Sequence, residues 1–530
     1  MNISLTNNKA FKWYKKESLF FKGYFYIDTH FYEKENAINY LSNLKSSKDF
    51  KEKLNVINGI FTIIISINDT FYIASDITRS FPVFYTFQNE KIFLSDEILY
   101  LKDKFNLNEF DKISEIELKA TNHTHGKKTL LKNVFQVQAS ELLIIKNDKI
   151  INSSFFFSYA IKKESTDSYA ILKNKTIIAF DNAFKRFIYS LNNRTVVVPL
   201  SGGYDSRLIA VMLKKHNYKN VVCYTYGKKD SFEIENSKNT AKELNFKWFF
   251  IEYTDELTSN FITTKDFKEY AHFAGKLSSM PNLQEYFAVK HLKENHLIDT
   301  NSIFIPGYAG DLLGGSQFIK VIPENLKHKE ITDLILSTKF NNFPISKSKK
   351  KLLKNEIEKK LIHFDENYLE KKASSVFEDY DLKEKIAKYI FNSANFYTFF
   401  GFEHRFPFWD KELLDFFKIV PEKHKLNKII FDDVLINEYF EPYNVHFEKE
   451  LQPTERNIYN QKIKEQIKPF LPTFIKQNFL QKNDWINYKL ITDQMRVLLT
   501  SKGLKLHKSY QNYNEIITQW YIYLSKNMIE

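Results

Sequence analysis

The sequence predicts an α/β protein in two parts: an antiparallel β-rich part, then a doubly wound parallel sheet with a helical extension. The chain has 530 residues, which is too long for one ordinary core. Its first part consists of short apolar runs separated by turn residues. Strand-like and helix-like segments then alternate, as they do in parallel sheets.

The β-rich part shows strand-length runs of β-branched and aromatic residues, broken by turn pairs such as Asn68-Asp69 and Asn147-Asp148. The predicted strands are Phe61–Ile67, Thr70–Ala74, Val83–Phe87 and Glu141–Lys146. This pattern predicts an antiparallel sheet.

The spacing of apolar residues changes after Lys162–Asp167, where it becomes helical. We expect Ile171, Ile178, Phe184 and Ile188 to share the buried face of one helix. The predicted domains are therefore residues 1–163 and 164–530.

The second part alternates strands with helices. Its predicted strands are Thr195–Leu200, Asn220–Tyr226, Trp248–Glu252 and Ser302–Pro306, and its predicted helices are Arg207–Lys215 and Phe232–Leu244. From about residue 320 to residue 530 the pattern is mostly helical. The βαβαβ order predicts a parallel sheet with ligands beyond the carboxyl ends of its strands.

Composition narrows the function classes. The net charge of +13 comes from 77 basic and 64 acidic residues. Lysines are interspersed with Glu and Asn, as in Lys347–Lys354 and Lys359–Lys372, which is typical of solvated helix faces, so we expect no nucleic-acid partner. Since the start of the chain lacks a signal peptide and no apolar run reaches about 18 residues, we expect no membrane span and a cytoplasmic protein.

The chain contains one cysteine, Cys223. A single cysteine excludes a disulfide within the chain and offers no cysteine cluster for structural zinc. Because Cys223 falls in a predicted strand, we expect a buried structural thiol.

One motif carries the chemistry: Val-Pro-Leu-Ser-Gly-Gly-Tyr-Asp-Ser at 198–206, between a strand and a helix. Backbone N–H groups of a Ser-Gly-Gly turn at a helix N-terminus form a cradle for anions, and glycine lets phosphate approach closely. Asp205 adds a carboxylate for Mg²⁺ and Ser206 a hydroxyl for phosphate. A simple Gly-Gly turn is the alternative, but the full motif is far more specific. The chain has no Gly-x-x-x-x-Gly-Lys-Ser/Thr motif, so a Walker-type enzyme is not supported.

This motif resembles the ATP-pyrophosphatase loop of the asparagine synthetase family. Three later segments resemble the family in the same order: Gly307–Asp311 with Gly314-Gly315, Phe402–Asp410, and Glu448–Glu450. The resemblance implies ATP and Mg²⁺ as ligands.

The roles implied by the resemblance fall into three groups. Leu200, Tyr226 and Gly307 would line the adenine and ribose, while Ser201, Gly202, Gly203 and Ser206 would hold the pyrophosphate. Asp205 and Asp311 would bind Mg²⁺, and Lys449 would stabilise negative charge during catalysis. Glu403 has two open interpretations: a catalytic role, or a structural ion pair with Arg405.

Residues 1–163 resemble the family's glutaminase domain at Asn58–Phe61, Ser75–Tyr85 and Phe93–Asp96. That activity needs a cysteine as the first residue of the mature chain, because its own amino group serves as the base. Here Asn2 follows Met1 and the one cysteine is internal. We therefore expect an inactive glutaminase-like domain.

A second departure is Tyr308, where asparagine synthetases usually carry glutamate. Tyrosine at this place is similar to β-lactam synthetases, in which it helps to deprotonate an internal amine. Both departures favour free ammonia or an amine of the substrate as the nitrogen source, so Tyr308 is a further catalytic candidate.

The resemblance predicts an AMP-forming carbon–nitrogen ligase acting on a small-molecule carboxylate with an ammonia or amine donor. Three substrates stay open: aspartate, a sugar uronic acid in surface polysaccharide synthesis, and a small molecule or peptide closed by an internal amide. A catalytically silent nucleotide-binding or regulatory homologue is the alternative of another class. The sequence leaves open a homodimer or an ammonia-supplying partner.

Overall fold

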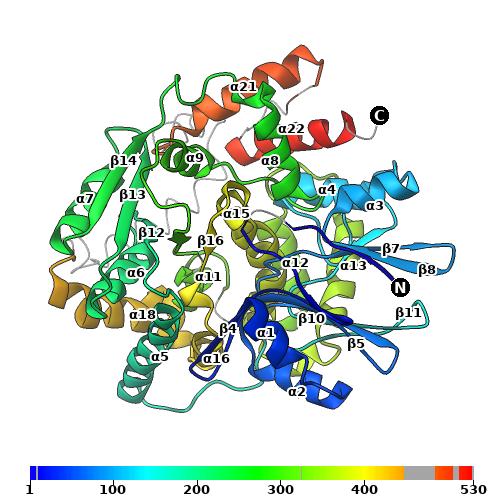
Figure 1. The fold of residues 1–530 in the computed structure, drawn as a ribbon, viewed down its shortest axis with the longest axis horizontal. Coiled ribbons are helices and arrows are strands. Elements are labelled where there is room, and N and C mark those ends of the chain that lie inside the picture. Colours follow the sequence, from blue (N-terminus) through cyan, green and yellow to red (C-terminus); the bar gives the residue numbers. More distant parts are fainter. Residues whose placement is uncertain are drawn as a thin grey trace.

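The computed structural model describes residues 1–7, 10–308, 310–323, 325–446, 484–504, 506 and 512–527. Within these residues the strands form three sheets, two of them in the amino-terminal part and one parallel sheet beyond it. Figure 1 shows the parallel sheet beside helices α6 and α7, with the amino-terminal sheets on the opposite side of the molecule. The predicted α/β fold class is confirmed.

The amino-terminal part is a sandwich of two sheets. The larger sheet has the order β11-β10-β6-β5-β3-β2 with β4 on β3, and the smaller has the order β1-β8-β7-β9. Side chains such as Ile64, Leu143 and Leu94 pack between the sheets. Their strands are β1 (Asn2–Ser4), β2 (Tyr14–Lys16), β3 (Leu19–Ile27), β4 (His30–Glu33), β5 (Asn58–Ile67), β6 (Thr70–Ser75), β7 (Phe84–Gln88), β8 (Lys91–Ser95), β9 (Val134–Gln136), β10 (Glu141–Lys146) and β11 (Lys149–Phe155).

The prediction of these strands was accurate at β10 and short at β5, which begins at Asn58 instead of Phe61. Helices α1 (Lys34–Leu41) and α2 (Ser47–Val56) cover the outer face of the larger sheet through Leu41, Phe50 and Leu54. Each face of that sheet is therefore packed, which explains its long apolar runs.

The second part contains a parallel sheet with the order β14-β13-β12-β15-β16. Its strands are β12 (Val196–Pro199), β13 (Val221–Gly227), β14 (Lys247–Glu252), β15 (Ile303–Phe304) and β16 (Glu403–His404). Both neighbours of β12 run parallel to it, so the strand order reverses there. Such a switch point opens a crevice at the carboxyl ends of the strands, here beyond β12 and β15.

Helix α5 (Tyr169–Tyr189) corrects one prediction. Ile171 and Ile178 are 48% and 49% exposed, whereas Phe184 is fully buried beside Phe180. At 3.6 residues per turn, Phe184 lies about 140° around the axis from Ile171, so the four predicted residues cannot share one face. The buried face runs instead through Leu172, Thr176, Ala179, Phe180, Ala183, Phe184 and Phe187.

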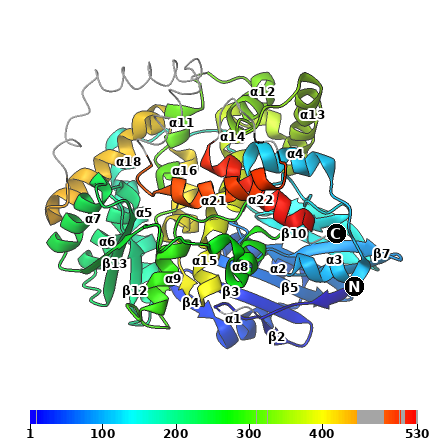
Figure 2. The same cartoon turned by 90° about the horizontal axis from the view of Figure 1, so that it is seen from above.

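Beyond residue 320 the described residues are mainly helical, as predicted, and Figure 2 shows α12 beside α13 and α21 beside α22. The remaining helices are α3 (Ile98–Phe105), α4 (Lys112–Thr121), α6 (Tyr204–Lys215), α7 (Phe232–Glu243), α8 (Lys265–Gly275), α9 (Tyr286–Glu294), α10 (Gly310–Leu313), α11 (Ser316–Lys320), α12 (His328–Lys339), α13 (Lys347–Phe364), α14 (Ala373–Asp381), the π-helix η3 (Leu382–Ile390), α15 (Asn395–Phe400), α16 (Lys411–Ile419), α17 (Glu422–Lys425), α18 (Ile429–Val434), α21 (Tyr488–Ser501) and α22 (Tyr513–Asn527). Among the described residues, no helix combines the length and apolarity needed to cross a membrane.

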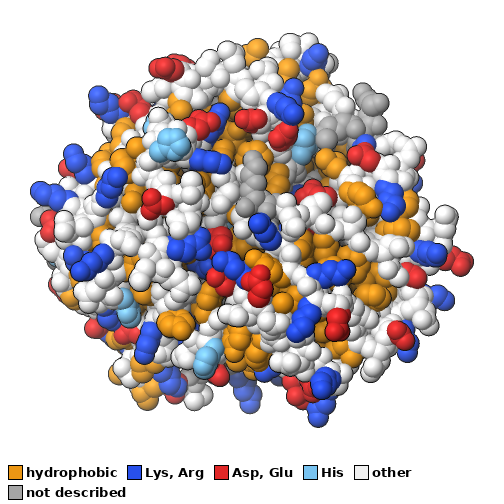
Figure 3. All heavy atoms as spheres, in the orientation of Figure 1, with side chains coloured by type: hydrophobic (Ala, Val, Ile, Leu, Met, Phe, Trp, Pro, Cys, Tyr) orange, Lys and Arg blue, Asp and Glu red, His pale blue; other side chains and the backbone are white. Residues whose placement is uncertain are grey.

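One apolar cluster joins the two predicted domains. Tyr24 and Phe81 from the first share it with Phe184 and Phe408 from the second. The boundary between residues 163 and 164 therefore stays a prediction. Cys223 is fully buried in β13, and burial raises the pKa of its thiol to about 12, in agreement with an inert structural role. Figure 3 shows Lys and Arg dispersed among Asp and Glu over one face of the molecule.

Candidate active site

The loop between β12 and α6 is held in shape by two serines. The backbone N–H of Ser201 donates to Ser206 Oγ over 3.0 Å, and the two hydroxyl oxygens are also 3.0 Å apart. Gly203 is the N-cap of α6, and its N–H donates to Ser201 Oγ over 3.1 Å. These bonds arrange the loop around the helix N-terminus, where the partial positive charge favours an anion.

Gly202 has a different environment from its neighbours. Its N–H donates to the Glu233 carboxylate, and a Cβ at Gly202 would lie 3.0 Å from Glu233 Oε2. Burial raises the pKa of Glu233, although the Gly202 N–H and the charge of Arg207 lower it. A phosphate oxygen at this amide would require the Glu233 carboxylate to move or to bind a proton.

Asp205 and Asp311 lie next to each other at the switch point. The backbone N–H of Asp311 donates to Asp205 Oδ2 over 3.0 Å. A Cβ at Gly310 would come within 2.6 Å of Asp205 Cγ, and one at Gly307 within 2.9 Å of Asp205 Cβ. Both glycines are required because the Gly307–Asp311 segment packs directly on the Asp205 turn.

The charge of this pair fits a divalent cation. Burial, followed by the neighbouring charge of Asp311, raises the pKa of Asp205, while the charge of Lys428 opposes this shift. A carboxylate whose pKa is raised by burial and by a neighbouring carboxylate is stabilised in its ionised form by a hard cation, which takes oxygen ligands. The residues present therefore fit Mg²⁺ bound by Asp205 and Asp311.

A cavity of about 440 Å³ opens beside this loop. Most of the predicted ligand-binding residues line it: Leu200, Ser201, Gly203, Asp205, Ser206, Tyr226, Gly307, Tyr308 and Asp311. Of the predicted site residues that the structure describes, Gly202 and Glu403 do not line the cavity. Lys449 lies outside the described residues, so its predicted role stays a prediction.

A buried carboxylate, Glu285, lies at the inner wall of the cavity. Three tyrosines donate to it: Tyr224, Tyr397 over 2.7 Å, and Tyr308 over 3.5 Å. Burial raises the pKa of Glu285 to about 7, although the three hydroxyl groups lower it. Tyr308 also lines the cavity, so its hydroxyl connects the cavity to a carboxylate that changes charge near neutral pH.

Glu403 lies at the opposite edge of the sheet. It pairs with Ile303 at the amino-terminal end of β15, whereas the cavity lies beyond the carboxyl ends. Its carboxylate is 2.9 Å from Arg194 and 3.0 Å from Arg405, and Arg405 is 1% exposed. The charge of Arg405, and then that of Arg194, outweighs burial and lowers the pKa of Glu403 to about 2. These contacts favour the structural ion pair over a catalytic role.

Sequence reasoning missed several residues of the cavity, among them Glu233, Glu285, Lys428 and Trp485. Glu285 immediately precedes α9, and no motif marks it in the sequence. Lys428 places a cation in the same cavity as Asp205, but it is the last residue of a short 3₁₀ helix, Leu426–Lys428, far along the chain. Only the folding of distant segments onto the sheet edge brings these side chains together.

Comparisons with known proteins give one family. Residues 180–437 match the family model of asparagine synthase. No match to a curated protein was found. An NH₃-dependent NAD synthetase from Campylobacter jejuni subsp. jejuni in complex with the nitrate ion is 18% identical, with 42% of this chain and 96% of that chain covered and a TM-score of 0.20. A glutamine phosphoribosylpyrophosphate amidotransferase from B. subtilis complexed with ADP and GMP is 11% identical, with 57% and 64% covered and a TM-score of 0.19. At these TM-scores neither structural similarity bears on function.

Proposed function

Residues 180–437 form an asparagine synthase domain and place the chain in the asparagine synthetase family; from this premise we propose that the protein is an AMP-forming amide ligase. It uses ATP to activate a carboxylate for attack by ammonia or an amine. The observation that carries the proposal is the cavity in which the Ser201–Ser206 loop, Asp205 and Asp311 meet.

The proposed first step joins the substrate carboxylate to ATP. A carboxylate oxygen attacks the α-phosphorus, and the bond to pyrophosphate breaks, which yields an acyl-adenylate. The Ser206 hydroxyl and the Gly203 N–H, which donates to Ser201 Oγ in this structure, would hold the leaving pyrophosphate at the N-terminus of α6. Asp205 and Asp311 would hold Mg²⁺, which neutralises phosphate charge. Lys428 adds a positive charge to the same cavity.

The proposed second step needs a neutral amine. The nitrogen attacks the acyl carbon, AMP leaves, and one proton must depart from the nitrogen. Tyr308 would accept this proton as its own proton passes to Glu285, to whose carboxylate it donates a hydrogen bond. The position of Tyr308 in the cavity and the pKa of about 7 for Glu285 support this role.

The same pair favours a second candidate, an intramolecular amide ligase. A substrate that carries its own amine needs no ammonia, but it does need a base beside the nitrogen. The Tyr308–Glu285 contact supplies such a base. Aspartate and a sugar uronic acid stay substrate candidates for the form of the reaction that uses ammonia.

Pyrophosphate release from Mg-ATP tests the proposed function. We expect release only when a suitable carboxylate is present, with AMP as the other nucleotide product. The measurement screens aspartate, uronic acids and amino-bearing carboxylates, each with ammonia, with glutamine and with no added nitrogen donor.

The pattern of activity separates the candidates. Release and amide formation with ammonia but not glutamine would support an amide ligase with an inactive glutaminase-like domain. Amide formation without any added donor would support the intramolecular reaction. If ATP does not bind and no carboxylate elicits release, the enzyme proposal fails and a silent homologue takes its place.

The pH dependence of amide formation is a further prediction. Since Glu285 accepts a proton only when ionised, the rate should rise as pH increases through about 7, the pKa of Glu285. We expect Glu285→Gln to lose this rise, because an amide does not titrate. Rates are measured between pH 6 and 9 for the wild type and for Glu285→Gln. The ratio of the two rates at each pH cancels the titration of the amine itself. An unchanged ratio across this range would contradict the role of Glu285.

A further inference from the structure

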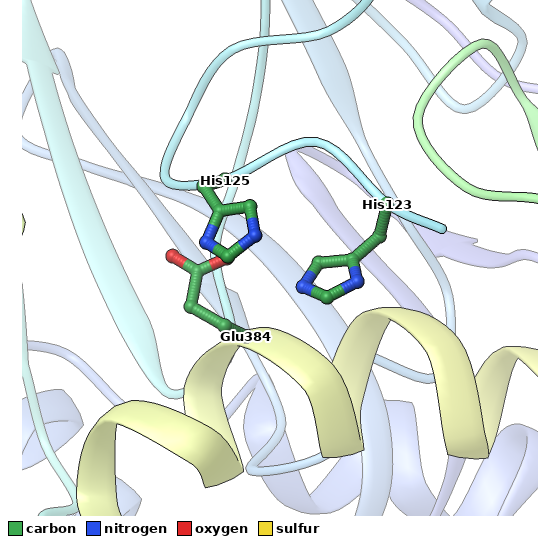
Figure 4. Close-up of side chains that lie close together, drawn as sticks. All are labelled: His123, His125 and Glu384. Carbon is green, nitrogen blue, oxygen red and sulfur yellow. The ribbon is translucent and has the colours of Figure 1, made fainter. Parts of the chain in front are cut away.

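A second group of titratable side chains lies away from the candidate active site. Figure 4 shows His123 and His125 on the loop after α4, facing Glu384 of the π-helix η3. All three residues are 1% exposed, and one donor atom from each lies within 4.8 Å of the others. The π-helix is a rare element that is frequent at functional sites.

One residue, Thr121, orients both histidines. The Thr121 carbonyl can only accept, so His123 Nδ1, 2.9 Å away, carries its proton. The Thr121 hydroxyl lies within reach of the Glu117 and His123 carbonyls, and its single hydrogen goes to one of them. It therefore accepts from His125 Nε2 over 3.0 Å. A histidine that donates one ring N–H to an oxygen in this way presents its other nitrogen as a metal ligand.

The second ring nitrogen of His123, Nε2, is buried and has no hydrogen-bond partner among the described residues. Burial is the largest cause that lowers the pKa values of both His123 and His125. The second ring nitrogen of His125, Nδ1, accepts from the Tyr380 hydroxyl over 2.9 Å, so a metal ion bound there would displace this hydroxyl. A cavity of about 320 Å³, lined by both histidines and Glu384, leaves room for a water ligand.

Lys388 balances the charge of Glu384 in this structure. Its ammonium is 2.7 Å from Glu384 Oε2, 2.7 Å from the Gly126 carbonyl and 3.3 Å from the Thr124 carbonyl. A cation bound at Glu384 would compete with the Lys388 ammonium for this carboxylate, while the Gly126 and Thr124 carbonyls can keep the ammonium in place.

We propose that His123, His125 and Glu384 form a binding site for a divalent transition-metal ion, specifically Zn²⁺, with water as the fourth ligand. Two imidazoles and one carboxylate are a common zinc ligand set. Zinc bonds of about 2.1 Å bring tetrahedral ligands to within about 3.4 Å of one another, so binding contracts the cluster. The ion would join the loop after α4, in the predicted first domain, to the helical extension.

The test uses the full chain without a histidine tag, freed of metal by a chelator and kept in excess Mg²⁺ to occupy carboxylate sites. Isothermal titration with Zn²⁺ should show one equivalent bound, and Co²⁺ should give the visible absorption of a tetrahedral site. His123→Gln and Glu384→Gln should lose this equivalent. Thr121→Val should weaken it about 10- to 100-fold. His272→Gln, which changes a half-buried histidine outside the cluster, should bind as the wild type does.

Lys388→Met separates a metal site from a purely structural network. Without metal this variant leaves the buried Glu384 charge unpaired, so we expect a lower Tm than the wild type. Zn²⁺ should restore the Tm, and the variant should bind Zn²⁺ more tightly because the competing ammonium is gone. The proposal is overturned if the wild type binds no equivalent of Zn²⁺, if His123→Gln binds equally well, or if Zn²⁺ fails to restore the Tm of Lys388→Met.

Discussion

Asp205→Asn and Asp311→Asn should each reduce pyrophosphate release from Mg-ATP by about 10³-fold or more. A divalent cation contributes several kcal/mol of charge stabilisation during phosphoryl chemistry, and each 1.4 kcal/mol corresponds to about tenfold in rate. Both residues line the cavity, and the Asp311 backbone N–H donates to Asp205 Oδ2 over 3.0 Å, so losing either carboxylate would leave an incomplete ligand set.

The measurement is the rate of pyrophosphate release at saturating ATP over a series of Mg²⁺ concentrations. Asp255→Asn is the matched control, because Asp255 is an exposed carboxylate that follows β14 but does not line the cavity. It should retain the wild-type rate. Wild-type release in Asp311→Asn would remove Asp311 from the proposed metal site. Wild-type release in both variants would refute the assignment of this cavity as the site of Mg-ATP.

Tyr308→Phe and Glu285→Gln should separate the two steps of the proposed reaction. We expect formation of the acyl-adenylate to continue, since neither residue belongs to the phosphate loop. Amide formation should fall by about 10²- to 10⁴-fold, the usual contribution of a positioned proton acceptor. Isotope exchange between pyrophosphate and ATP reports the first step, and quantification of the amide reports the second.

Hydroxylamine provides a check on this assignment. It is neutral near pH 7 and needs less help from a base, so it should restore product formation in both variants. Tyr397→Phe is the matched control: it also removes a hydroxyl that donates to Glu285, but Tyr397 does not line the cavity. Equal losses in Tyr397→Phe and Tyr308→Phe would indicate that these tyrosines only support the fold.

Local patterns in the sequence were sufficient for the fold class. Apolar runs of strand length predicted β5, β6, β10, β12 and β13, because a strand buried on both faces must be apolar throughout. Helix orientation was harder to predict. The exposed isoleucines Ile171 and Ile178 on α5 suggested the wrong buried face. Which face of a helix packs on the core depends on the surrounding elements, which the local sequence does not show.

The turn that carries the Ser201–Ser206 motif was also predictable from sequence, because its geometry is local. Gly203 and Ser206 are close in the chain, and the helix that follows them fixes their geometry. The partnership of Asp205 with Asp311 followed from the family resemblance. The structure adds a physical reason, since Gly307 and Gly310 permit the close approach of the second segment.

The sequence by itself therefore determined the fold class and the strand–turn–helix unit that carries the Ser201–Ser206 motif. The tertiary structure decided that Glu285 lies behind Tyr308, that Glu233 occupies the Gly202 N–H, and that Glu403 faces Arg194 at the far edge of the sheet. The physical reason is the range of each interaction. Strand, helix and loop geometry depend on neighbouring residues, whereas the burial and the pKa of a carboxylate depend on segments brought from elsewhere in the chain.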